Sequence, residues 1–159
     1  MRTWSIPPAI TVPGALRTEV GGHPLVARLL AQRGITEPQR ARAFLNPEYY
    51  TPASPHALPG MDGAVQLIQE SIAHKQLMRV WGDFDVDGQS ATALLVEALH
   101  AAGARVSYAL PLRREGHGLN ERAVRQAAAD GVFLLITCDT GISDVEMVTL
   151  ANALGLKVI

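Results

Sequence analysis

Three aspartates stand at alternating positions in one glycine-bounded segment, which reads Gly82-Asp83-Phe84-Asp85-Val86-Asp87-Gly88 and follows the apolar run Leu77–Trp81. Carboxylates this close together repel one another in a half-buried loop unless a cation offsets their charge. A divalent metal is the economical explanation. Mg²⁺ and Mn²⁺ prefer carboxylate oxygens, and a pair of them can clamp the attacking and leaving oxygens of a phosphoryl transfer.

A polar turn with helix-capping aspartates is the alternative, and it accounts for any one of these residues better than for all three together. A calcium loop of the EF-hand type is excluded. Asp83 to Gly88 matches the opening of that loop, but its twelfth position is Leu94, where a bidentate glutamate is required.

A fourth carboxylate, Asp139, follows the apolar run Val132–Thr137. If the two runs are neighbouring strands of one sheet, Asp139 faces the same crevice as the aspartates of residues 83–87, which would suit a shared ligand. A turn aspartate that precedes Gly141 is the alternative reading of this residue.

Cations and glycines gather between these segments, in residues 111–120. Glycines allow a ligand to approach the backbone closely, and Arg or His can hold a phosphate and stabilise charge that develops in a transition state. A flexible, solvated surface loop is the alternative. The candidate substrate-binding residues are Arg113, Arg114, Gly116, His117 and Gly118, with Arg122 and Arg125 close by in the sequence.

The elements that must position these residues alternate between strands and helices from Met61 onward. Strands are predicted at 77–81, 105–110, 132–137 and 156–159, and helices around 67–73 and at 90–102 and 120–131, with a capping box at 143–146 before a further helix. This β-α-β-α-β-α-β order predicts an α/β fold: a parallel, Rossmann-like sheet with helices on both faces and ligands at the carboxyl ends of its strands.

Residues 1–60 differ from the rest in texture, because they are rich in Pro and Gly and contain no strand-like run. We expect a short helix around Leu25–Leu30, a capping box at Thr36–Gln39 that opens a helix over 37–45, and an extended loop over 46–59. The predicted division is therefore a helical and extended segment, 1–60, and the first part of an α/β domain, 61–159.

Composition sets weaker bounds on function. The chain has 159 residues, is 48% hydrophobic, and has a formal net charge of −1, so no global field gathers nucleic acid. Its apolar runs are too short to span a bilayer, and a single cysteine, Cys138, permits no internal disulfide. We expect a soluble, cytoplasmic protein with no membrane partner.

The motifs together resemble those of RecJ-type nucleases in the DHH phosphoesterase family. Gly82 to Gly88 is similar to that family's GD(Y/F)D(A/V)DG motif, Glu115-Gly116-His117-Gly118-Leu119 to its EGYGL loop, and Ile136 to Ile142 to its ITVDCGI segment. Weaker matches lie at 33–36, 43–47 and 61–64, so the resemblance covers about 25–159.

The resemblance implies hydrolysis of phosphodiester bonds in single-stranded DNA from the 5′ end, with Mn²⁺ or Mg²⁺, in recombination and repair. It also implies single-stranded DNA as a partner, together with single-strand-binding protein and recombination helicases. Carried over to this chain, Asp85, Asp87 and Asp139 are metal ligands, Asp83 is a ligand or supports the ligands, and Arg113 and His117 contact substrate phosphate.

The chain departs from the family pattern at several positions. The loop at 113–115 is one residue short, which leaves open whether Arg113 or Arg114 contacts phosphate, and His117 replaces Tyr, Thr140 replaces Cys and Cys138 stands where Val is common. After Ile159 the family continues into its DHH motif, so we expect a fragment with half a metal site and little activity alone. The rival functions are another DHH-family phosphoesterase, such as an oligoribonuclease, a cyclic-dinucleotide phosphodiesterase or an inorganic pyrophosphatase, and a non-catalytic RecJ-like binding module.

Overall fold

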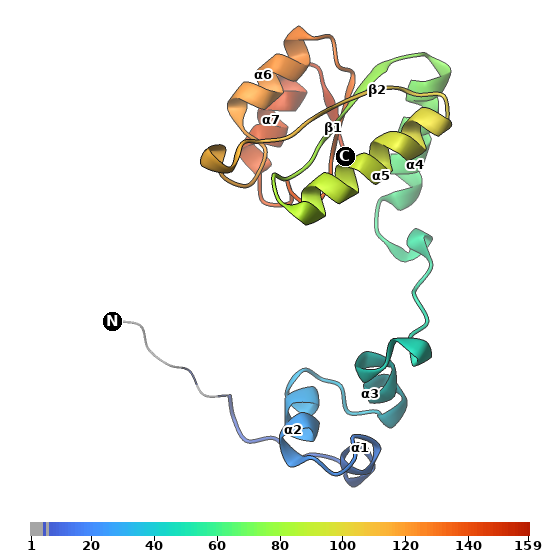
Figure 1. The fold of residues 1–159 in the computed structure, drawn as a ribbon, viewed down its shortest axis with the longest axis vertical. Coiled ribbons are helices and arrows are strands. Elements are labelled where there is room, and N and C mark those ends of the chain that lie inside the picture. The colour runs from blue at the N-terminus through green and yellow to red at the C-terminus, as the bar shows by residue number, and fades with distance from the viewer. Residues whose placement is uncertain (1–4, 6) are drawn as a thin grey trace. The chain divides into compact units, whose positions relative to one another are not determined.

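The computed structural model describes residue 5 and residues 7–159, and it divides into two compact units, Met1–Pro55 and His56–Ile159. Residues 1–4 and 6, which belong to the expected N-terminal segment, lie outside the described residues. The two units are described separately (Figure 1).

The first unit consists of short helices around a small core of its own. Its helices are α1 (Gly14–Glu19), α2 (Pro24–Gln32) and α3 (Pro38–Leu45). Apolar side chains of these helices meet Ile35, from the turn between α2 and α3, in one buried cluster, whose other members are Leu16, Ala27, Leu30, Ala31 and Ala41.

The predicted capping box at Thr36–Gln39 is wrong. The N-cap of α3 is Glu37, whose side chain makes no capping hydrogen bond, and the helix begins at Pro38. Proline suits the first helical position because it has no N–H to satisfy and its φ is already helical. Two further features were not predicted: helix α1, and the 3₁₀ turns η1 (Pro47–Tyr49) and η2 (Pro55–Ala57) in the expected loop.

The second unit contains a four-stranded parallel sheet. Its strands are β1 (Leu77–Trp81), β2 (Arg105–Ala109), β3 (Leu134–Thr137) and β4 (Lys157–Val158), in the order β2-β1-β3-β4. Trp81, the last residue of β1, pairs with Ala109 on one side and with Thr137 on the other. The loops that follow β2 and β3 therefore flank the loop that follows β1.

Helices cover both faces of this sheet, as predicted (Figure 1). Met78 and Val80 of β1 pack into a cluster with side chains of α4 (Met61–Ala73) and α5 (Val86–Ala101), whereas Trp81 packs with side chains of α6 (Glu121–Ala129) and α7 (Val145–Ala153). Successive strand side chains point to opposite faces, so one buried strand supplies both cores. None of the described helices is long and apolar enough to cross a bilayer.

Several helix and strand ends differ from the prediction. Helix α5 begins at Val86 rather than Ser90, because the Asp85 side chain accepts a hydrogen bond from the Gly88 N–H and caps the helix earlier. Strand β3 begins at Leu134 rather than Val132, whose N–H closes the end of α6 on the Ala127 carbonyl. The Asn120 cap is confirmed, by a hydrogen bond of 2.9 Å from the Ala123 N–H.

Candidate functional site

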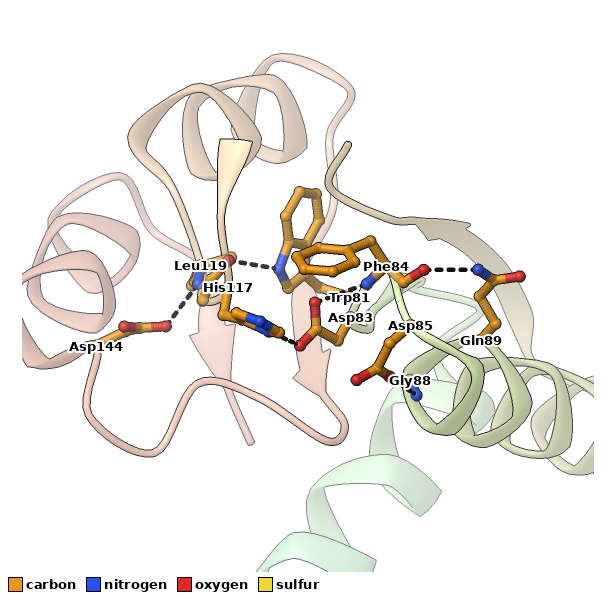
Figure 2. Close-up of polar contacts among 10 residues, drawn as sticks. Trp81, Asp83, Phe84, Asp85, Gly88, Gln89, His117, Leu119 and Asp144 are labelled. Atoms are coloured by element: carbon orange, nitrogen blue, oxygen red, sulfur yellow. Dashed lines mark hydrogen bonds and ion pairs between the residues drawn. The ribbon is translucent and has the colours of Figure 1, made fainter. Parts of the chain in front are cut away.

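Asp83 is a buried carboxylate at the carboxyl end of β1, with a residue exposure of only 4%. One of its oxygens accepts a hydrogen bond of 2.6 Å from the Phe84 N–H, and the other is bonded to Nδ1 of His117 (Figure 2). The aspartate loop and the loop after β2 are thereby joined through a single carboxylate.

Opposing effects act on the pKa of Asp83. Burial raises the pKa, while the hydrogen bonds from His117 and the Phe84 N–H and the nearby charges of His117 and Arg113 lower it. The lowering effects prevail, so the pKa lies below its ordinary value. The side chain is therefore an ionised, acceptor-only group at neutral pH.

The other two aspartates of the segment lie at the start of α5. Asp85 caps the helix through a bond of 3.0 Å from the Gly88 N–H, and Asp87, in the first turn, is exposed. A helix N-terminus carries partial positive charge and stabilises carboxylates there. The alternative of capping aspartates is thus correct for Asp85, and the helix N-terminus also favours a carboxylate at Asp87, but Asp83 precedes the helix and is not explained in this way.

The glycines of the segment permit a close approach of α5 to the end of β1. A Cβ atom added to Gly82 would lie 1.9 Å from Oγ1 of Thr92, and one added to Gly88 would lie 2.5 Å from both the Cβ and the backbone N of Asp83. Neither position can accept a larger side chain without a backbone shift. The glycines therefore fix where the carboxylates stand.

Asp139 stands at the end of the neighbouring strand β3. It lies two residues beyond Thr137, just as Asp83 lies two residues beyond Trp81, the partner of Thr137 in the sheet. Its side chain is exposed, and its φ of 58° is in the left-handed region, which is uncommon for a residue other than glycine and often marks a functional site. The adjacency on which the shared-crevice prediction depended is confirmed.

The loop after β2 brings a cation and an imidazole to the same place. The guanidinium carbon of Arg113 lies 4.7 Å from the centre of the Phe84 ring. The centres of the His117 and Phe84 rings are 4.4 Å apart, and the two ring planes are tilted by 41°. Arg114 makes no hydrogen bond or ion pair with any of the described residues. The structure thus gives Arg113 a direct contact with the aspartate segment.

The other two arginines near this loop are already paired. Arg122 donates to Glu115 at 2.9 Å and Arg125 donates to Glu121 at 2.7 Å. Both pairs lie at the surface. The apparent cluster of four arginines is therefore reduced to Arg113 and Arg114 as cations for a ligand.

Two residues that sequence reasoning missed also belong to the site. The Trp81 indole N–H donates to the Gly118 carbonyl at 3.2 Å, and the Asp144 carboxylate accepts from the Leu119 N–H at 2.5 Å (Figure 2). The predicted capping box at Ser143–Glu146 is wrong: the N-cap of α7 is Asp144, whose side chain does not cap the helix. No spacing in the sequence indicates that this carboxylate bonds to a different loop.

The segment that contains these site residues matches a known protein family. Residues 78–159, more than half of the chain, match the DHH family, N-terminal domain. The chain belongs to the DHH family. The matched range begins in β1 and contains all the candidate site residues, so the family resemblance inferred from the motifs is confirmed.

The relatives of this DHH-family chain include RecJ exonucleases from two bacteria. The chain is 37% identical over 137 residues to the single-stranded-DNA-specific exonuclease RecJ of Bacillus subtilis, covering 86% of this chain and 17% of that protein. For RecJ of Escherichia coli the identity is 36% over 138 residues, with coverages of 86% and 23%. The chain thus spans less than a quarter of the length of these curated relatives.

Solved structures give the same likeness. A crystal structure of exonuclease RecJ bound to manganese matches with a TM-score of 0.59 and 34% identity, over 67% of this chain and 28% of that one. RecJ from Thermus thermophilus in complex with Mn²⁺ matches with a TM-score of 0.58 and 25% identity, over 94% of this chain and 21% of that one. The DHH-type α/β fold is confirmed by both.

The donor chemistry of this DHH-family site suits a hard divalent cation. Asp87 and Asp139 are exposed and make no hydrogen bond or ion pair among the described residues, so their side chains can turn toward a cation without breaking a contact. Residues 5 and 7–159 contain no group of three or more His, Cys, Asp or Glu side chains arranged to hold a metal ion. The assignment of Asp85, Asp87 and Asp139 as ligands stays a prediction.

The glycine in the first turn of α5 generates a stability prediction. Gly88→Ala should lower the free energy of unfolding by about 1–3 kcal/mol, because the new methyl group meets the backbone of Asp83. Gly63→Ala in α4 is the matched control: its Cβ meets nothing within 4 Å, so it should be neutral or stabilising by up to about 1 kcal/mol. Urea unfolding followed by circular dichroism measures both, and equal effects would contradict the close approach.

Glu115 generates a pH prediction. The hydrogen bond from the Leu112 N–H lowers its pKa most, burial opposes this, and Arg122 and Arg114 lower it further. A lowered folded-state pKa stabilises the fold above the unfolded value of about 4.3, and the stabilisation disappears as the pH falls through the folded value. Glu115→Gln should therefore be less stable than the parent at pH 7, with the difference vanishing as the pH falls from about 5 through the lowered folded-state pKa.

The measurement is urea unfolding of parent and variant at a series of pH values. Glu146→Gln serves as the control, because Glu146 is exposed and makes no hydrogen bond or ion pair among the described residues. A stability difference for Glu115→Gln that stays constant across this pH range would show that the carboxylate charge has no part in holding the loop.

Proposed function

We propose that this chain supplies part of the active site of a single-stranded-DNA exonuclease, which hydrolyses phosphodiester bonds from the 5′ end with two Mn²⁺ or Mg²⁺ ions. The observation that carries the proposal is the junction of two neighbouring loops at one end of the sheet. Carboxylates follow β1 and β3, and the loop after β2 adds Arg113 and His117 through their contacts with Phe84 and Asp83. The choice of substrate is supported by the RecJ relatives, which are single-stranded-DNA-specific exonucleases.

The carboxylates of Asp85, Asp87 and Asp139 would hold the metal ions in this proposal. Divalent ions, when bound, polarise the phosphoryl group and stabilise the charge that develops on its oxygens. Among the described residues no lysine or arginine forms an ion pair with any of these three aspartates, so no cationic side chain offsets their negative charge at this edge of the sheet. A bound cation relieves that repulsion.

Arg113 and His117 would bind the substrate phosphate. A guanidinium offers donors in a planar fork that matches phosphate oxygens, and an imidazole adds a further donor. Asp83 orients His117 by bonding to its Nδ1, which leaves Nε2 for the ligand. The positive φ values of Gly116 and Gly118, 82° and 100°, allow the loop between them to turn tightly beside the phosphate.

The same proposal places the chemistry in residues 61–159 and gives residues 1–60 no catalytic role. It includes action in DNA recombination and repair, a cytoplasmic location, and single-strand-binding protein and recombination helicases as partners. The likeness to the RecJ relatives supports these points.

A chimera tests the proposed activity. The matching region of Bacillus subtilis RecJ is replaced by this chain, and Mn²⁺-dependent degradation of 5′-phosphorylated single-stranded and double-stranded DNA is measured. We expect the chimera to degrade the single strand. Asp139→Asn should slow this degradation by at least about 100-fold. Mutation of a residue that only supports a metal ligand already lowers activity by about 10–100-fold, and loss of a ligand should cost more.

Glu97→Gln is the matched control, because this exposed acid of α5 loses the same charge away from the strand ends and should leave the rate unchanged. Circular dichroism verifies that each variant is folded. A folded chimera that cuts nothing would favour a non-catalytic binding module. Equal rates with Asp139→Asn and with the parent would exclude Asp139 as a metal ligand.

A further inference from the structure

The backbone immediately after His117 is held from two directions. The buried Trp81 side chain, at the end of β1, donates its indole N–H to the Gly118 carbonyl at 3.2 Å. The Asp144 carboxylate, which comes from the segment between β3 and α7, accepts the Leu119 N–H at 2.5 Å. Because Leu119 is itself 5% exposed and packed in the core, this end of the loop has little freedom.

Asp144 lies directly against the backbone of Gly118. A Cβ atom on Gly118 would stand 3.0 Å and 3.1 Å from the two carboxylate oxygens of Asp144, and Gly118 has a φ of 100°. The φ strongly favours glycine at this position, and a Cβ atom there would push the Asp144 carboxylate away by a few tenths of an ångström. The contact between the two loops is a close fit rather than a chance approach of two surface side chains.

Asp144 also belongs to the loop that carries Asp139. Its own N–H donates to the Gly141 carbonyl at 3.0 Å, which closes the turn that follows Asp139. A pocket of about 240 Å³ lies between the two loops, lined by His117, Gly118 and residues 140–144. One carboxylate therefore connects the loop with the predicted metal ligand to the loop with the predicted phosphate-binding residue.

The side chain of Asp144 bonds to Leu119 instead of capping its own helix, α7. Aspartate is among the best N-cap residues, and Asp144 occupies the N-cap position of α7, yet its side chain makes no capping hydrogen bond. The carboxylate that would stabilise its own helix is instead used to hold a different loop.

We propose that Asp144 is a positioning residue: through the Leu119 N–H it holds His117 against Asp83 and Phe84, and it thereby sets the rate at which the site acts on phosphate. This inference rests on the proposed function. A displacement of about 1 Å in a substrate-positioning group can cost about 100-fold in rate, so a single hydrogen bond to the loop can have a large effect.

The contact itself is tested by amide hydrogen exchange in the 159-residue chain, measured by NMR. Asp144→Ala should speed exchange of the Leu119 amide by about 10-fold or more, as expected for the loss of a hydrogen bond to a carboxylate. Asp144→Asn retains an acceptor oxygen and should preserve most of the protection. Glu146→Ala removes the same charge from the first turn of the same helix and should have no effect on Leu119.

The role in catalysis is tested in the chimera with Bacillus subtilis RecJ. Asp144→Ala should lower kcat for single-stranded DNA by about 10–100-fold, with Asp144→Asn and Glu146→Ala close to the parent. If Asp144 acts through His117, the double variant Asp144→Ala/His117→Ala should be no slower than His117→Ala alone.

Three results would overturn the role of Asp144. The first two are unchanged Leu119 exchange and unchanged kcat in Asp144→Ala. The third is a double variant whose loss in kcat is the product of the two single losses, which indicates a general structural role. A parent chimera that folds but cuts nothing is a different outcome. It overturns the proposed function and, with it, the role of Asp144 in positioning residues for that reaction.

Discussion

Asp83 places a carboxylate at the end of a buried strand, where it has little contact with water. A buried charge costs several kcal/mol unless hydrogen bonds satisfy it. The Phe84 N–H and His117 meet that requirement here, and their positions follow from it: the chain must turn at Phe84, and the loop after β2 must fold over the end of β1. The approach of α5, the ring contacts of Phe84 and the placement of Arg113 all depend on this arrangement.

The strand order makes such a junction possible. Because β1 lies between β2 and β3, the loops that leave all three strands emerge side by side at one edge of the sheet. Glycine at positions 82 and 88 lets the following helix start almost in contact with the strand end, which brings the helix N-terminus to the same edge. Asp144 then connects the outer two loops, so the residues of three separate loops form one compact region.

Much of this could be predicted from the sequence. The apolar runs and their spacing predicted the parallel sheet. The grouping of Asp83 with Asp139 was predicted only on the condition that their strands are neighbours, and the pairing of β1 with β3 meets that condition. The predicted capping boxes at Thr36 and Ser143 are wrong for physical reasons. A local pattern cannot show that a helix begins at Pro38 without a side-chain cap. Nor can it show that the Asp144 carboxylate accepts a hydrogen bond from the distant Leu119 N–H. The bond from Asp83 to His117 was equally hidden, because it joins residues 34 positions apart.

We propose that the carboxylates after β1 and β3 form one cation site. Paramagnetic broadening by Mn²⁺ tests it most directly, with the chain labelled with ¹⁵N and its amide signals followed during a titration. Signals of residues 83–88 and 139–141 should broaden first and together, and Asp139→Asn should weaken the effect at both segments. Broadening at only one of them, or stronger broadening at exposed acids elsewhere, such as Glu48 or Glu97, would contradict it.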